Sequence, residues 1–120
     1  MAQRPSEILK KADYKVNGRL WIEGDGQRFF GPGPVELLEH IHETGSINQA
    51  AKRMGLSYTK AWTLVSNMNA MAEHPFVITN TGGEKGGGSS VSPEALQMIE
   101  YHRQLRERFR LFLEKETRNL

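Results

Sequence analysis

The chain has 120 residues, 38% of them hydrophobic and 25% charged, and a formal net charge of +2 at pH 7. That length and composition indicate one soluble globular domain with a modest core. The absence of cysteine excludes disulfides, thiolate metal sites and thiol catalysis. No apolar run approaches the ~18–20 residues of a membrane-spanning helix, and residues 1–6 lack the apolar region of a signal peptide. We therefore expect a cytoplasmic protein without a membrane partner.

The first predicted elements are a short helical turn at Ile8-Leu9 and a β-hairpin over residues 14–31. Asp25-Gly26 is a strong hairpin-turn dipeptide, and Asn17-Gly18 is a second turn signal that could interrupt the first strand. Apolar side chains recur in steps of two along that strand, at Tyr14, Val16, Leu20 and Ile22.

Three helices are predicted over residues 34–73. The first has Pro34 in its first turn and ends at Gly45. The second begins at Ser46, where the Ser-x-x-Gln pattern predicts a capping box. The third begins at Ser57 and continues to residue 73, because His74-Pro75 stops it. Helical spacing assigns the following side chains to the buried faces of the three helices in turn: Leu37, Leu38 and Ile41; Ile47, Ala50 and Met54; Ala61, Leu64, Val65, Met68 and Ala72.

The second and third helices have the pattern of a helix-turn-helix. Ala51 is a small residue for the point where the helices touch, Gly55 lies in the turn, and Leu56 follows it as an apolar plug. Residues 46–72 contain three basic side chains and no acidic one, whereas the preceding helix carries Glu36, Glu39 and Glu43. Such a charge distribution indicates entry into the DNA major groove, although a solvated basic face remains the alternative.

A strand over residues 76–79, a glycine-rich loop and a returning strand at residues 89–91 predict a hairpin wing. Residues 81–90 hold five glycines. A phosphate-binding P-loop is excluded, since Lys85 is followed by glycine and the loop leads into a strand. A glycine-rich loop exposes its backbone N–H groups, and with Lys85 at the tip of the loop it suits contact with phosphates or with the minor groove. A loop without a role is the alternative, and Glu84 opposes close phosphate contact.

The last predicted helix covers residues 93–116, with a Ser92 cap and Pro93 in its first turn. Its length of roughly 35 Å is large for so small a domain. Apolar side chains on a protruding helix need a partner, so we expect a dimer through this helix. The alternative is that the helix folds back on residues 14–30. The expected dimer contacts are Met98, His102, Leu105, Phe109 and Phe112.

The candidate DNA contacts fall into three groups. The first turns of the recognition helix supply base and phosphate contacts, with Lys60 able to donate to guanine or to a phosphate. Trp62 is either a buttress between that helix and the hairpin or a direct DNA contact. The whole predicted set is Ser46, Asn48, Gln49, Lys52, Arg53, Ser57, Tyr58, Thr59, Lys60, Thr63, Thr81, Gly82, Gly83, Lys85 and Gly86.

Catalytic and metal-binding patterns are missing from the sequence. His40 and His42 are two residues apart and point to different sides of a helix. His102 lies on an apolar seam, and no histidine pairs with carboxylates at metal-ligand spacing. We expect no enzyme activity and no cofactor.

Several segments resemble the N-terminal domain of ModE-type molybdate-responsive transcriptional regulators, a winged helix related to the LysR-type DNA-binding domain. The resemblance covers residues 20–113. It is carried by Thr-Gly-Ser-Ile-Asn-Gln-Ala-Ala at 44–51, Gly-Leu-Ser-Tyr-Thr-Lys-Ala-Trp at 55–62, Asn-Met-Asn at 67–69 and Thr-Gly-Gly-Glu-Lys-Gly-Gly-Gly at 81–88. It implies a homodimer, a roughly palindromic operator, base reading by residues 57–63 and backbone contact by the wing.

The resemblance stops short of molybdate sensing. Family members continue into molybdate-binding domains, and no such domain is expected in residues 1–120, so an effector is not predicted. The predicted fold class is α+β: a winged helix-turn-helix with an N-terminal β-hairpin and a long C-terminal dimerisation helix. The predicted function is sequence-specific binding of double-stranded DNA by a dimeric transcriptional regulator. The alternative is a winged-helix module that binds a protein.

Overall fold

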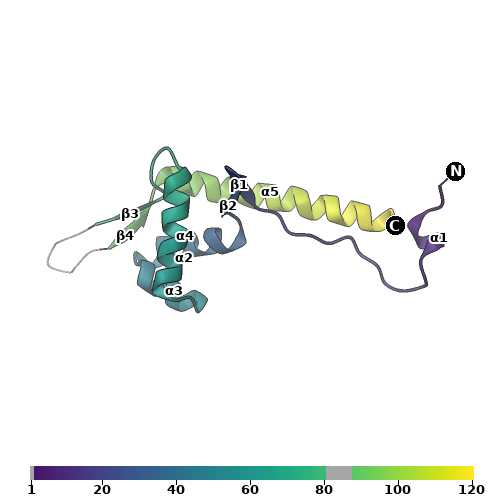
Figure 1. Cartoon of the computed structure of the whole chain (residues 1–120), viewed down its shortest axis with the longest axis horizontal. Coiled ribbons are helices and arrows are strands. Elements are labelled where there is room, and N and C mark those ends of the chain that lie inside the picture. The colour runs from purple at the N-terminus through teal and green to yellow at the C-terminus, as the bar shows by residue number, and fades with distance from the viewer. Residues whose placement is uncertain (1, 81–87) are drawn as a thin grey trace. The chain divides into compact units, whose positions relative to one another are not determined.

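The computed structural model describes residues 2–80 and 88–120 (Figure 1). These residues belong to two compact units, one formed by Met1–Leu20 with Arg103–Leu120 and the other by Trp21–His102. We call them the terminal unit and the central unit and describe each separately. In chain order the elements are α1 (Pro5–Ile8), β1 (Ile22–Gly24), β2 (Gln27–Phe30), α2 (Pro32–Thr44), α3 (Ile47–Met54), α4 (Tyr58–Met71), β3 (Val77–Thr79), β4 (Ser89–Val91) and α5 (Pro93–Arg118).

Helix α2 supplies the centre of the core in the central unit. Leu37, Leu38 and Ile41 are fully buried, as their helical spacing predicts. The helix begins at Pro32, two residues before the predicted start. It ends at Gly45, whose left-handed φ of 70° and N–H bond to the Ile41 carbonyl at 2.7 Å close the last turn.

The α3–turn–α4 segment has the geometry of a helix-turn-helix. Gly55 adopts a left-handed φ of 66°, and its N–H donates to Lys52 while the Leu56 N–H donates to Ala51. This pair of bonds satisfies the carbonyls at the end of α3 and turns the chain sharply into α4. Ala51 and Ala61 are buried, because small side chains let two helices approach closely at the crossing.

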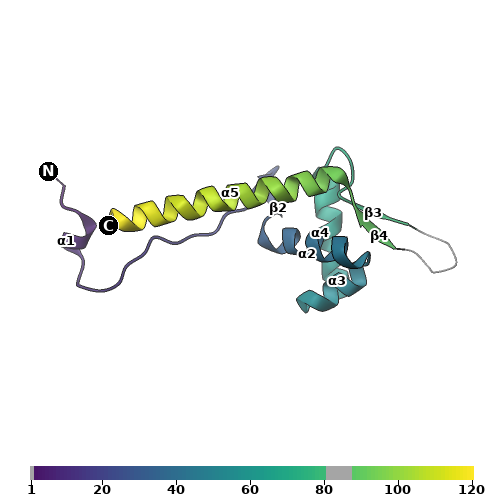
Figure 2. The ribbon, with the colours of Figure 1, turned by 180° about the vertical axis from the view of Figure 1, so that it is seen from behind.

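Strands β3 and β4 form the described part of the wing. They are antiparallel, with Val77 opposite Val91 and Thr79 opposite Ser89, and they lie side by side in both views (Figures 1 and 2). The Ser89 N–H donates to the Gly45 carbonyl at 2.8 Å, which joins β4 to the turn between α2 and α3. The predicted fold class is confirmed: an α+β winged helix-turn-helix followed by a long helix.

Two further predicted boundaries are wrong. The hairpin is limited to β1 and β2, joined by the Asp25-Gly26 turn, and residues 13–21 form no strand. The earlier segment lies on a helix in the terminal unit, where the Val16 N–H donates to the Thr117 hydroxyl at 2.9 Å. Helix α4 ends at Met71, two residues before the prediction, because Ala72 is already extended.

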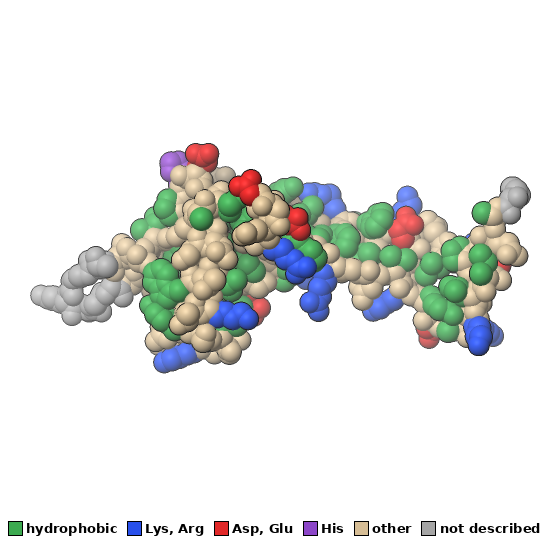
Figure 3. Space-filling view, in the orientation of Figure 1, with side chains coloured by type: hydrophobic (Ala, Val, Ile, Leu, Met, Phe, Trp, Pro, Cys, Tyr) green, Lys and Arg blue, Asp and Glu red, His purple; other side chains and the backbone are tan. Residues whose placement is uncertain are grey.

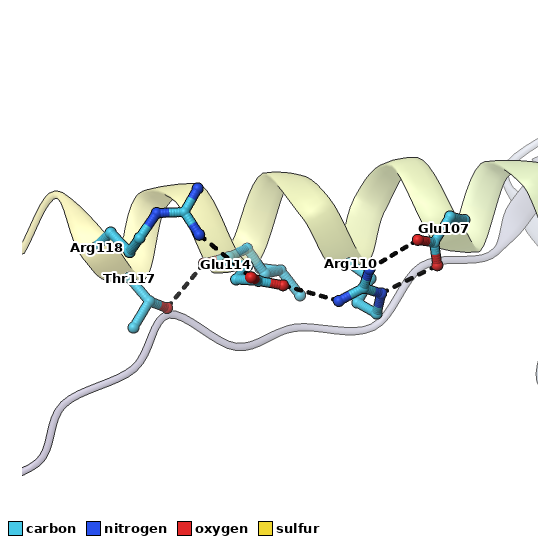
Figure 4. Close-up of polar contacts among 6 residues, drawn as sticks. Glu107, Arg110, Glu114, Thr117 and Arg118 are labelled. Atoms are coloured by element: carbon cyan, nitrogen blue, oxygen red, sulfur yellow. Dashed lines mark hydrogen bonds and ion pairs between the residues drawn. The ribbon is translucent and has the colours of Figure 1, made fainter.

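The terminal unit joins the N-terminal segment to the second half of α5. A Cβ atom at Gly18 would lie 3.2 Å from the ring of Phe109, so the backbone at this glycine covers that side chain closely. Figure 4 shows the ion pairs along α5, where Arg110 bonds Glu107 and Glu114 at 2.7 and 2.8 Å. The hydrogen bond from Arg110 lowers the pKa of the Glu107 carboxyl and raises the pKa of the guanidinium.

The predicted dimer seam on α5 is partly covered within each unit. His102 is 1% exposed and packs edge-on against Phe30 at 5.6 Å in the central unit. Phe109 lies under Gly18 in the terminal unit. Residues of the predicted hairpin segment thus cover these two positions, as the alternative of a folded-back helix anticipates. His102 cannot serve as a dimer contact in this conformation, while Phe112 remains 54% exposed.

Candidate nucleic-acid interface

The first turn of α4 is open to solvent. Tyr58 is 51% exposed, and Thr59 and Lys60 are exposed beside it. Ser57 precedes them as the cap, with its hydroxyl accepting the Lys60 N–H at 3.0 Å. The N–H groups of Tyr58 and Thr59 belong to the first turn, whose donors have no partner within a helix. This end of α4 therefore presents backbone donors, two hydroxyls and one ammonium to an anionic ligand.

Tyr58 and Trp62 form an aromatic pair on α4. The two residues are one helical turn apart, and their rings make an edge-to-face contact with a centre-to-centre distance of 6.1 Å and an interplanar angle of 82°. Trp62 also packs against the core, so its edge contact restrains the Tyr58 ring. Next to them the Thr63 hydroxyl donates to the Thr59 carbonyl at 3.0 Å, which leaves the Thr63 methyl group as its outward feature.

Helix α3 adds a second row of exposed polar side chains, at Asn48, Gln49 and Lys52. Ser46 caps this helix and accepts the Gln49 N–H at 3.1 Å. The second half of the predicted capping box is absent, since the Ser46 N–H donates to the Thr44 hydroxyl instead of the Gln49 side chain.

Arg53 differs from the other predicted contacts because it forms an ion pair with Glu43 of α2, at 2.7 Å. Both side chains are about half exposed or more, at 48% and 63%. An exposed pair of this kind typically contributes ~0.2–1 kcal/mol. A phosphate can therefore displace Glu43 at small cost, but Arg53 is less available than Lys52 or Lys60.

Charge is unevenly distributed over the central unit. On the face seen in Figure 3, Lys and Arg side chains lie at the end that carries α3, with an acidic side chain beside them, and further acidic side chains lie along the opposite edge. Neither α3 nor α4 has an acidic residue in its first turn. The positive end of each helix dipole therefore has no acidic side chain in its own first turn to compensate it.

Sequence reasoning named Asn69 only within the Asn-Met-Asn segment of the resemblance and assigned it no role, whereas in the structure it fixes the far end of α4. Its amide oxygen accepts the N–H groups of Phe76 and Val77 at 2.8 and 3.1 Å, and its amide nitrogen donates to the Val77 carbonyl at 3.1 Å. One side chain thus orients the start of β3 relative to α4. An Asn near a helix end, followed by a Pro and a strand, is the local signal that could have suggested this role.

The wing residues predicted to contact DNA, namely Thr81, Gly82, Gly83, Lys85 and Gly86, lie outside the described residues. Over residues 2–80 and 88–120, no group of three or more His, Asp or Glu side chains could hold a metal ion. None of the helices described is both long enough and apolar enough to cross a membrane.

An exposed, acid-free second helix, a preceding capped helix at a sharp glycine turn and an adjoining β-hairpin define a winged helix-turn-helix. The chain is similar to the N-terminal part of ModE-type transcriptional regulators. It is 39% identical to the transcriptional regulator ModE of Haemophilus influenzae over 74 residues, or 62% of this chain. It is 35% identical to the molybdenum transport protein ModE of Azotobacter vinelandii over 102 residues, or 85% of this chain.

A third relative is the molybdenum-pterin-binding protein MopB of Rhodobacter capsulatus, 41% identical over 78 residues, or 65% of this chain. No protein-family model matches the chain. The chain spans only 29%, 38% and 28% of the length of these three relatives in turn.

Proposed function

We propose that this chain is a sequence-specific DNA-binding transcriptional regulator that acts as a homodimer. The observation that carries the proposal is the open first turn of α4, where Tyr58, Thr59 and Lys60 are all exposed on an acid-free helix. The similarity to proteins named as transcriptional regulators supports DNA as the partner over a protein-only winged helix.

In the proposed complex α4 lies in the major groove with its first turn against the base edges. Lys60 donates to guanine O6 and N7, and the Thr63 methyl contacts a thymine methyl. Lys52 and the N-terminal N–H groups of α4 contact phosphates and fix the register. Trp62 acts as a positioning residue, because its edge contact holds the Tyr58 ring in one orientation. The wing, including Lys85, contacts the neighbouring backbone.

The operator is found by sequencing the DNA fragments that co-purify with the protein. The measured mass of the free protein tests the dimer, since a 13.6 kDa species at working concentration would contradict it. Affinity for the recovered operator should fall steeply with salt, because each neutralised phosphate releases counterions. Binding that is undetectable or insensitive to salt would refute the proposal.

Lys60→Ala should lower the affinity for the operator by roughly 1–3 kcal/mol, because it removes a donor to a base or a phosphate. Fluorescence anisotropy on the operator and on variants changed at one base pair measures the loss. If Lys60 reads a base, discrimination at one position disappears. If it binds a phosphate, all sequences weaken together and the salt slope falls by about 1.

The matched control is Lys11→Ala, which removes an exposed lysine from the terminal unit. It changes the net charge equally and should leave operator affinity within experimental error. Equal losses for both variants would mean that Lys60 acts only through the total charge of the protein, and base or phosphate contact by α4 would be rejected.

A further inference from the structure

Tyr58 is an exposed aromatic side chain at an otherwise polar helix start. It is the first residue of α4, and the next two residues, Thr59 and Lys60, are polar and exposed. On α3 and α4 the exposed large apolar side chains are Tyr58, at 51%, and Met71, at 41%. Met71 lies at the other end of α4, where its side chain packs against Gly24 of β1. Phosphate binding alone does not explain an aromatic ring left in water at the end of α4 that the proposed function places against DNA.

Trp62 restrains the Tyr58 ring. Residues four apart on a helix lie on the same face, and these two rings meet edge to face with their centres 6.1 Å apart. Trp62 in turn packs against the hydrophobic core. Because the core holds one member of the pair, the Tyr58 ring has less freedom to lose when it contacts a ligand. Binding through this ring therefore costs less conformational entropy than binding through a free side chain.

The C5-methyl group of thymine is the apolar group that base edges present in the major groove. The remaining groups there are hydrogen-bond donors and acceptors. The Cα–Cβ bonds of a helix tilt toward its N-terminus, and no turn of α4 precedes Tyr58. No turn of α4 therefore covers the ring when the first turn of the helix lies against base edges. The ring suits a pyrimidine methyl group, whereas the polar side chains beside it suit donors and acceptors.

We propose that the Tyr58 ring contacts a thymine methyl group, and that Trp62 is the positioning residue that holds the ring for this contact. The inference rests on the proposed function and adds a base identity to it: Tyr58 is a specificity-determining residue, and the base it selects is thymine. The Tyr58 hydroxyl makes no hydrogen bond within residues 2–80 and 88–120. Contact of this hydroxyl with a phosphate is the alternative that the experiment must separate from ring contact.

Deoxyuridine in place of single thymines of the operator tests the contact, because this substitution removes only the methyl group. At one thymine it should raise the dissociation constant of the wild-type protein about three- to fivefold, the effect of one buried methyl group. Tyr58→Ala should bind the thymine and deoxyuridine operators equally at that position. Tyr58→Phe should keep the wild-type ratio, since it keeps the ring. Fluorescence anisotropy measures the constants, and melting curves show whether each variant is folded.

Thr63→Ser is the matched control on the same helix. It removes a methyl group but keeps the hydroxyl, so it should leave the deoxyuridine effect at the Tyr58-dependent thymine unchanged. Trp62→Leu removes the edge contact and should bring the ratio of the two dissociation constants closer to one, although Tyr58 is still present. A Trp62→Leu variant that is folded and keeps the full ratio would overturn the positioning role of Trp62.

Photocrosslinking locates the contact without relying on affinity. The base 5-iodouracil carries iodine in place of the thymine methyl group and, when irradiated, crosslinks to an aromatic side chain in contact with it. With this base at the identified thymine, mass spectrometry should find the crosslink on Tyr58. A crosslink confined to other residues would overturn the contact.

The outcomes distinguish failure of this contact from failure of the proposed function. If deoxyuridine has no effect at any thymine, or keeps its effect in Tyr58→Ala, the ring does not contact a methyl group. If Tyr58→Phe weakens binding to all sequences as much as Tyr58→Ala, the hydroxyl binds a phosphate and the ring contact is rejected. Both results leave DNA binding by the chain intact. A wild-type protein that retains no DNA would overturn the proposed function itself.

Discussion

Replacing Phe30 by alanine is expected to lower the free energy of unfolding by about 3–5 kcal/mol. Phe30 is 1% exposed and lies between Phe76, at a ring separation of 5.8 Å, and His102, at 5.6 Å. It therefore joins the short hairpin to the residue that precedes β3 and to the first half of α5. Removing the ring leaves a cavity bordered by three elements that cannot all collapse into it. Urea denaturation followed by tryptophan fluorescence measures the loss.

Phe29→Ala is the matched control for this variant. Phe29 is the preceding residue of β2, and it is only partly buried against the core. Its loss should cost less than half as much as that of Phe30, because part of its ring is already in water. Similar losses for both variants would mean that β2 does not anchor the hairpin through Phe30.

The sequence predicted the helix-turn-helix well because its signals are local. Ser57 as a cap, Gly55 in the turn and Ala51 at the crossing each act within one or two turns of helix, and each has the predicted role. The buried face of α2 follows from helical period alone. The exposed first turn of α4 follows in the same way, since the buried face of a helix fixes its opposite face.

Elements that depend on distant partners were predicted less well. Alternating apolar residues at 14–20 suit a strand, but a strand needs a partner strand, and Val16 finds the Thr117 hydroxyl of a helix instead. On α5, helical spacing assigned His102 and Phe109 to an outward-facing dimer seam. Phe30 packs against His102 and Gly18 lies over Phe109, and neither of these contacts can be derived from the spacing.

The candidate site likewise combines features that follow from local sequence signals with features that depend on distant residues. Exposure of Tyr58, Thr59 and Lys60 could be derived from period and capping. The ion pair of Arg53 with Glu43 could not, because these residues are ten positions apart on different helices. The three hydrogen bonds of Asn69 also depend on where the chain returns after α4, and nothing in the local sequence fixes that path.

Asn69→Ala should lower the free energy of unfolding by about 2–3 kcal/mol, because a buried backbone donor left without a partner costs roughly 1–3 kcal/mol. The variant removes the acceptor for the N–H groups of Phe76 and Val77, both less than 10% exposed. Amide hydrogen exchange of these two residues should accelerate together. Operator affinity should fall as well, since β3 and the wing lose their fixed orientation relative to α4.

Two further variants distinguish the loss of the Asn69 hydrogen bonds from a general loss of stability. Asn67→Ala removes an exposed amide from the same helix and should leave stability and exchange unchanged. Asn69→Asp keeps an acceptor for the two N–H groups but loses the donor to the Val77 carbonyl, so its stability should lie between those of wild type and Asn69→Ala. If Asn69→Ala exchanges at Phe76 and Val77 as slowly as wild type, the amide does not hold β3, and the orientation of the wing must come from the Ser89–Gly45 bond at the other strand.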